Sequence, residues 1–451
     1  MANLLRKSRI TAGPGFNRWL IPPAALAIHL CIGQVYAFSV FNLPLTRAIG
    51  IDAPAPGDWK LTDVGWTFTL AIVFLGLSAA FGGKWLERAG PRASGVASAC
   101  LWGLGFLVAA VGVHRHQLWL LQLGYGVLGG CGLGIGYITP VSTLIRWFPD
   151  RRGMATGMAI MGFGGGAMIA APLSEALMRR FASPTSVGVA ETFLVLGAVY
   201  FAAMIAGAFL FRVPPEGWAP RGWTPPPATR VLASEHHVPV EAATLTPQFA
   251  LLWMILFLNV TAGIGVLGQA SPMIQEIFRG RIDAQAAAGF VGLLGLFNMG
   301  GRFAWASASD AIGRKATYAI FFAAGAVLFA LVPVAGRAGN VPLFVACFAA
   351  ILSMYGGGFA TIPAYLSDLF GTRQVGAIHG RLLTAWSAAG VAGPALIAYI
   401  RQYQVDHAVA KSDAYNLTMN LMAGLLGIGF LCNLLVTRVH PRHVRSREEL
   451  P

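Results

Sequence analysis

The sequence predicts an all-α membrane protein with about twelve transmembrane helices, arranged as two six-helix repeats of the same orientation. Of its 451 residues, 56% are apolar and only 11% are charged, and the mean hydropathy is +0.64. Soluble proteins carry about 25% charged residues. About twelve apolar stretches are long enough to span a bilayer, and the two halves of the chain match at one constant offset. This composition argues against a soluble enzyme, a disordered chain and a nucleic-acid-binding module.

Each predicted span has the length that a membrane helix requires. Crossing about 30 Å of hydrocarbon takes roughly 20 residues as a helix, and lipid offers the backbone no other hydrogen-bond partner. The net charge of +14 lies in short clusters between these spans, so it does not indicate nucleic acid. The predicted helices cover residues 20–45, 64–86, 94–113, 117–145, 153–178, 192–212, 248–275, 286–308, 316–335, 341–366, 376–400 and 415–437.

The basic residues predict the orientation of the chain. Lysine and arginine number 20 in the two termini, the even-numbered loops and the helix ends beside them, and 10 in the odd-numbered loops. Cytoplasmic loops carry the excess of positive charge, so we expect both termini in the cytoplasm of a bacterial inner-membrane protein. An even number of spans agrees with this orientation.

A proline-rich segment separates the two halves. Residues 213–247 hold eight of the 26 prolines and several charges, which predicts a cytoplasmic linker between bundles at 1–212 and 248–451. The bundles match at an offset of 223 residues, and parallel repeats of this kind enclose a central site and rock around it. The matching positions are Glu87, Gly90, Arg92, Pro140, Gly153 and Gly157 with Asp310, Gly313, Lys315, Pro363, Gly376 and Gly380.

At these positions the chain resembles the major facilitator superfamily, whose members carry a G-x3-D-R-x-G-R-R-like loop after the second helix and again after the eighth. Here residues 83–92 read GKWLERAGPR and residues 306–315 read ASASDAIGRK. Glutamate replaces the first aspartate, and the second loop lacks its leading glycine, but the charge pattern remains. The resemblance implies the major facilitator fold.

Longer blocks resemble the oxalate/formate antiporter family, which is related to the monocarboxylate transporters. They lie at residues 17–45 (with GQVYAFSVF at 33–41), at 132–140 (GLGIGYITP), at 147–157 (WFPDRRGMATG) and from 362–371 (IPAYLSDLFG) through Pro394. The resemblance covers nearly the whole chain. It implies a secondary carrier for small carboxylates.

Arg302 is the residue most indicative of a substrate. It lies about 6 Å from the centre of the eighth predicted span, where a charge costs several kcal/mol unless it is paired or hydrated. A guanidinium binds a carboxylate through two parallel hydrogen bonds and keeps its charge. The alternative is an internal salt bridge. The resemblance implies a carboxylate-binding arginine here, but the aspartate that animal monocarboxylate transporters carry four residues earlier is Asn298.

Three further polar residues lie inside predicted spans. Arg381 is either a second cation for a dicarboxylate or an arginine whose head reaches the interface. Histidine titrates in the physiological range, so His29 and His379 are candidates for a proton relay, or else hydrogen-bonded packing residues.

Aromatic and amide side chains are candidates for shaping the substrate cavity, with ordinary core packing as the alternative. These are Gln34, Tyr36, Tyr137, Tyr355 and Trp386, together with Asn298. The loop charges are candidates for cytoplasmic pairs that gate the carrier, as the superfamily resemblance implies. They are Glu87, Arg88, Asp150, Arg151, Arg152, Asp310, Arg314 and Asp368.

The predicted function is secondary active transport of small carboxylates, with oxalate/formate exchange as the preferred substrate pair. The alternative is a proton-coupled symporter for lactate- or pyruvate-like monocarboxylates. A membrane receptor is disfavoured by the duplicated architecture. The sequence contains no nucleotide-binding motif, metal cluster or catalytic triad, so no enzyme activity, cofactor or metal is expected. The expected partners are carboxylate anions and the bilayer, and the expected state is a monomer.

Overall fold

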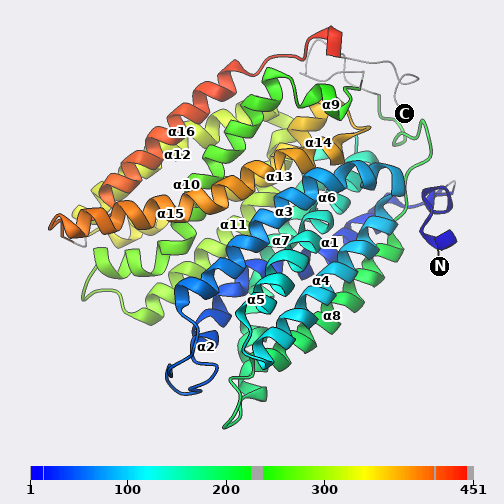
Figure 1. Cartoon of the computed structure of the whole chain (residues 1–451). Helices are drawn as coiled ribbons and strands as arrows, with labels where there is room; N and C mark the ends of the chain where they lie inside the picture. The colour runs from blue at the N-terminus through cyan, green and yellow to red at the C-terminus, as the bar shows by residue number, and fades with distance from the viewer. Residues whose placement is uncertain (1, 14, 225–236, 411–412, 444–451) are drawn as a thin grey trace. The chain divides into compact units, whose positions relative to one another are not determined.

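A computed structural model describes residues 2–13, 15–224, 237–410 and 413–443. These residues are almost entirely helical and form two compact units (Figure 1). The first unit contains residues up to Asp150, then 158–224 and 374–387; the second contains 151–157, the described residues of 225–373, and those from Ala388 onward. Part of the predicted linker, residues 225–236, lies outside the described residues. Isolated β-bridges are also present, one of which pairs Thr11 with Val213.

The first unit is built from the helices of the first repeat and from α14. Its elements are η1 (Ala2–Leu5), η2 (Lys7–Ile10), η3 (Arg18–Leu20), α1 (Ile21–Ile32), η4 (Gly33–Phe41), α2 (Asn42–Leu45), α3 (Leu61–Ala89), α4 (Pro91–His114), α5 (Leu118–Leu121), the π-helical η5 (Gln122–Gly129), α6 (Gly130–Trp147), most of α7 (Arg152–Phe181), α8 (Val189–Leu210) and α14 (Val375–Leu382). Helix α4 packs extensively against α8, and α3 packs against α6 and α14.

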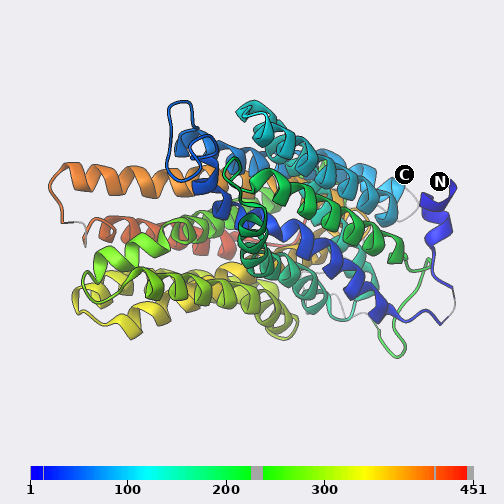
Figure 2. The same cartoon turned by 90° about the horizontal axis from the view of Figure 1, so that it is seen from below.

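The second unit contains the helices of the second repeat. In Figure 2 its long helices run roughly along one common direction. Its elements are the first turn and a half of α7, α9 (Val240–Ala243), α10 (Pro247–Ile277), α11 (Ala284–Ile312), α12 (Arg314–Arg337), α13 (Val341–Phe370), most of α15 (Thr384–Asp406), α16 (Asn416–Leu435) and η6 (Pro441–His443). The main pairings are α11 with α13 and α12 with α16.

The predicted membrane fold is confirmed. Among the described residues, eleven helical stretches are long and apolar enough to cross a membrane. Helix α11 is a further helix of 29 residues. Asn298 and Arg302 near its middle lower its mean hydropathy, and α11 is not among the eleven stretches. The two polar residues that suggest a substrate site thus make this helix less apolar.

Two glycines at equivalent positions of the repeats make equivalent turns. Gly90 separates α3 from α4 with φ +89°, and Gly313 separates α11 from α12 with φ +88°. A residue with a Cβ is strained in this region of φ, whereas glycine adopts it freely. The repeated motif therefore fixes the sharp reversal between consecutive helices in both halves of the chain.

Glycines also allow the closest helix approaches. The π-helical and helical stretch from residue 118 to 147 contacts α4 at Gly132 and α3 at Gly134, where an added Cβ would lie 2.6 Å from Trp102 N and 2.1 Å from Leu75 O. Small residues let helix backbones come into contact, and this packing accounts for the abundance of glycine in this span.

Adjacent glycines on α11 provide a matched test of this packing. A Cβ at Gly301 would lie 2.1 Å from Ser353 O of α13, whereas a Cβ at Gly300 would meet nothing within 4 Å. We expect Gly301→Ala to lower the free energy of unfolding by about 1–3 kcal/mol through overpacking. Gly300→Ala should leave it unchanged or raise it slightly. Thermal unfolding of both variants in detergent checks this; equal midpoints for the two would contradict the close α11–α13 contact.

Candidate functional site

Arg302 lies on α11 with its side chain fully buried. Its Nε donates a hydrogen bond to Asn298 Oδ1, one helical turn earlier, at 3.3 Å. Its guanidinium carbon lies 5.4 Å from the centre of the Phe359 ring on α13. The amide of Asn298 is neutral, so this contact orients the guanidinium without cancelling its charge. A cation with this environment is suited to binding an anion.

The backbone around Arg302 is held rigidly by α13 and by the start of α7. A Cβ on Gly356 would lie 2.1 Å from Asn298 O, and a Cβ on Gly157 would lie 2.9 Å from Arg302 O. Tyr355, only 2% exposed, contacts Phe359 edge to face at 5.3 Å. The predicted residues Asn298, Arg302 and Tyr355 therefore belong to one cluster in the second unit.

A second cluster of predicted residues lies in the first unit. Tyr137 on α6 contacts His29 on α1, His379 on α14 and Trp386 on α15, with ring centroids 5.3, 5.9 and 5.2 Å apart. Tyr36 on η4 contacts Trp386 at 6.2 Å. Five of the predicted site residues, from three separate stretches of the chain, thus form one aromatic cluster.

Phe163 on α7 completes this cluster. Its ring contacts those of Tyr36, Tyr137 and Trp386 at 5.1, 5.4 and 5.6 Å. Neither Phe163 nor Phe359 was predicted from the sequence. With 28 phenylalanines in the chain, no pattern distinguishes these two from core residues.

Gln34 and Arg381 differ from the other predicted residues. Gln34 Oε1 accepts a hydrogen bond of 2.7 Å from the hydroxyl of Tyr125 on η5, and its buried Nε2 has no hydrogen-bond partner among the described residues. Tyr125 packs against Phe38 and Phe106. Arg381 is half-buried on α14, and its carbonyl accepts a hydrogen bond from the Thr384 hydroxyl.

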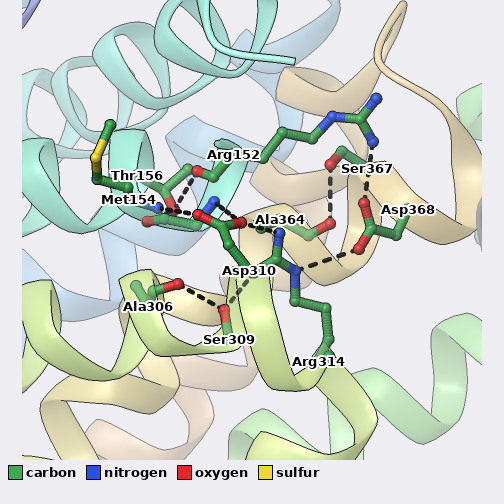
Figure 3. Close-up of polar contacts among 12 residues, drawn as sticks. Arg152, Met154, Thr156, Ala306, Ser309, Asp310, Arg314, Ala364, Ser367 and Asp368 are labelled. Atoms are coloured by element: carbon green, nitrogen blue, oxygen red, sulfur yellow. Dashed lines mark hydrogen bonds and ion pairs between the residues drawn. The ribbon is translucent and has the colours of Figure 1, made fainter. Parts of the chain in front are cut away.

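Four of the predicted loop charges, Arg152, Asp310, Arg314 and Asp368, form a polar network in the second unit (Figure 3). Asp368 Oδ1 accepts from Arg152 Nη1 at 3.0 Å, and its Oδ2 accepts from Arg314 Nε at 3.2 Å. Arg314 Nη2 donates to Asp310 Oδ1 at 2.5 Å. The two oxygens of Asp310 also accept from the backbone N–H groups of Gly153 and Met154, at 2.9 and 2.8 Å. This carboxylate caps the positively polarised first turn of α7.

The equivalent network in the first unit contains Glu87. Its carboxylate pairs with Arg146 and accepts from Gly376 N at 3.0 Å, while Arg88 is exposed. The offset of 223 residues relates Glu87 to Asp310 and also Gly376 to Gly153. Each unit therefore contains the same contact between an acidic loop residue and a helix start. Arg146 was not predicted, because only the tertiary packing brings it to Glu87.

The chain is similar over most of its length to known transporters. The oxalate:formate antiporter of Oxalobacter formigenes is 28% identical over 435 residues, covering 96% of this chain and 94% of the antiporter. Human monocarboxylate transporter 11 is 27% identical over 412 residues, covering 88% and 80% of the two chains. The solved structure of the proton:xylose symporter XylE matches 92% of this chain and 94% of its own at a TM-score of 0.65 and 14% identity.

The profile of the Major Facilitator Superfamily matches residues 24–394, which include both clusters and both acidic contacts to helix starts. Membrane-spanning helices, the duplicated loop motif and this match agree. The chain belongs to the major facilitator superfamily and is a membrane transporter.

Proposed function

We propose that this protein carries small carboxylates across the bacterial inner membrane by alternating access, with both termini in the cytoplasm and with exchange of oxalate for formate as its reaction. The observation that carries the proposal is Arg302, a fully buried guanidinium near the middle of a membrane helix, oriented by the neutral Asn298. A substrate carboxylate provides the two parallel acceptors that a guanidinium binds best. The antiporter that resembles the whole chain supports this substrate class.

We assign the carboxylate contact to Arg302 and give the aromatic residues the task of excluding water from the substrate. Tyrosine and tryptophan combine an apolar ring with a hydrogen-bond donor, so they suit a small anion with a polar end. The residues proposed to contact or enclose the substrate are Gln34, Tyr36, Tyr137, Asn298, Tyr355 and Trp386. Glu87, Arg88, Asp310 and Arg314 are proposed to control opening at the loop ends of the helices. We propose that the bundles 1–212 and 248–451, joined by the linker 213–247, move as the two halves of the carrier.

Counterflow in proteoliposomes tests the proposal. Vesicles loaded with formate or oxalate should take up labelled oxalate without an imposed pH gradient. Uptake of monocarboxylate only when a proton gradient is imposed would favour the second candidate, a proton-coupled symporter. That candidate is supported by the two buried histidines, His29 and His379, in the first unit. Absence of uptake for every carboxylate in a panel, under both conditions, would contradict the carboxylate assignment.

Arg381 tests whether a dicarboxylate needs a second cation. If Arg381 provides it, Arg381→Gln should reduce oxalate uptake about tenfold or more and reduce formate uptake much less, because only the dianion loses a charge-assisted hydrogen bond. The ratio of oxalate to formate initial rates measures this effect. Arg373→Gln, in the neighbouring loop, is the matched control. Equal losses for the two substrates would exclude Arg381 as the second cation.

A further inference from the structure

Both ring nitrogens of His29 face backbone carbonyl oxygens. The side chain lies fully buried in the middle of α1. Its Nδ1 is 2.6 Å from the carbonyl oxygen of Ala159 on α7, and its Nε2 is 3.1 Å from the carbonyl oxygen of Tyr137 on α6. One imidazole therefore links α1 to two neighbouring helices of the first unit.

This geometry has a chemical consequence, because a carbonyl oxygen only accepts hydrogen bonds. A neutral imidazole has one N–H donor and one acceptor nitrogen, whereas the imidazolium has two donors. Neutral His29 would satisfy one carbonyl and place a nitrogen lone pair against the other. The imidazolium satisfies both. The Tyr137 ring, stacked on His29 at 26° between the planes, also presents the negative face of its π-system to the charge.

We propose that His29 is a proton-binding site, and that the bound proton holds α1 against both α6 and α7. When the proton leaves for water, the imidazolium N–H bond breaks and one O–H bond forms on the water that accepts the proton. One of the two carbonyl contacts then becomes repulsive, and a buried polar group without a partner costs about 1–3 kcal/mol. The deprotonated protein therefore favours an arrangement in which α1 has separated from α6 or α7. A proton that binds one arrangement better than another shifts the equilibrium between them.

The second buried histidine has the opposite environment. His379 on α14 is 1% exposed, and neither of its ring nitrogens has a hydrogen-bond partner among the described residues. It interacts electrostatically with His29, so the two imidazoles would repel each other if both were charged. Of these two histidines, only His29 has a carbonyl oxygen within hydrogen-bond distance of each ring nitrogen. The proton therefore resides on His29, and His379 stays neutral.

The other groups around His29 do not change this assignment. From α6 the titratable neighbour is Tyr137, and from α14 it is His379. Helix α7 contributes the Ala159 carbonyl and the Phe163 ring, at 6.5 Å. Helix α8, which also packs against α1, places Tyr200 near Cys31.

Spectroscopy on the full chain in lipid nanodiscs tests the proposal without requiring transport. Nitrogen-15 shifts of labelled histidine distinguish the imidazolium from both neutral tautomers. In the His379→Gln protein, the signal of the buried histidine should be an imidazolium in acidic buffer and should lose one proton as the pH is raised. The signal should be absent from His29→Gln. A neutral tautomer at every pH, or an imidazolium that disappears with His379, would overturn the proposal.

A transport measurement links the site to the proposed carrier, and this arm alone rests on that function. Wild-type counterflow should change with pH by up to about tenfold per unit, as expected for a single proton. His29→Gln should flatten the profile, whereas His407→Gln, on an exposed residue at the end of α15, should retain it. An unchanged profile in His29→Gln would exclude coupling through His29. A chain that transports no carboxylate, yet shows the imidazolium, would contradict the proposed function and leave the proton site standing.

Discussion

Replacing Arg302 with lysine is expected to lower carboxylate uptake by roughly 10- to 100-fold. Lysine keeps the positive charge but presents a compact ammonium instead of a planar fork, so one of the two parallel hydrogen bonds to the carboxylate is lost. A hydrogen bond to a charged group contributes about 1.5–3 kcal/mol, and about 1.4 kcal/mol corresponds to a tenfold change in affinity. The substitution also removes the hydrogen bond from Arg302 Nε to Asn298 Oδ1. Without this bond, the positive charge is no longer held over the Phe359 ring.

The measurement is the initial rate of labelled carboxylate uptake, together with the substrate concentration at half-saturation. We expect the half-saturation concentration to rise, because lysine weakens binding in each state that holds the substrate. Arg281→Lys is the matched control, since Arg281 is exposed and donates to Gly339 O outside the cluster. Near-normal uptake by Arg302→Lys, with Arg281→Lys also normal, would remove Arg302 from the substrate site.

The fold and the burial of Arg302 within a membrane helix could be predicted from the sequence because their signals are local. Apolar runs identify the spans. A charged side chain inside such a run costs free energy unless it is paired or hydrated, so it indicates a candidate functional site. Gly90 and Gly313 were identified by the repeat, and their positive φ angles show why glycine is required there. The close backbone contacts of Gly132 and Gly134 show why the span from residue 118 to 147 is rich in glycine.

The surroundings of the site could not be predicted, because they depend on contacts between distant parts of the chain. Phe359 lies beside Arg302, although an aromatic residue in an apolar span carries no distinguishing signal. The acceptors of His29 are backbone carbonyls, which every residue possesses. The offset of 223 residues predicted that Glu87 and Asp310 are equivalent, but it could not show that each accepts from the helix start of the other repeat, at Gly376 and Gly153.

Asp368→Asn is expected to have the second large effect, because this one carboxylate is shared by two guanidinium groups. Its oxygens accept from Arg152 and Arg314, and the side chains of these residues are 9–20% exposed. Asparagine has nearly the same shape, but it has one acceptor oxygen and no charge. Breaking a fully buried ion pair costs about 3–5 kcal/mol, and exposed pairs contribute about 0–1 kcal/mol. We therefore expect a loss of about 2 kcal/mol for this partly buried network.

This loss should appear as easier opening where the start of α7 meets α11 and α13. Ala155 on α7 is fully buried beside this network, so a cysteine placed there should react slowly with a hydrophilic maleimide. About 2 kcal/mol corresponds to an open population roughly 30-fold larger, and labelling should accelerate by the same factor when opening precedes reaction. Asp406→Asn is the matched control, because Asp406 is exposed and accepts from Gln402 within α15.

A double-mutant cycle with Arg152→Gln separates the ion pair from a general loss of packing. If Arg152 and Asp368 act together, the double variant should label only slightly faster than Asp368→Asn, because the second substitution removes a partner that is already lost. Fully additive effects would mean that the two side chains contribute independently. Labelling of Asp368→Asn at the rate of the Asp406→Asn control would show that Asp310, through Gly153 and Met154, holds the start of α7 without help from Asp368.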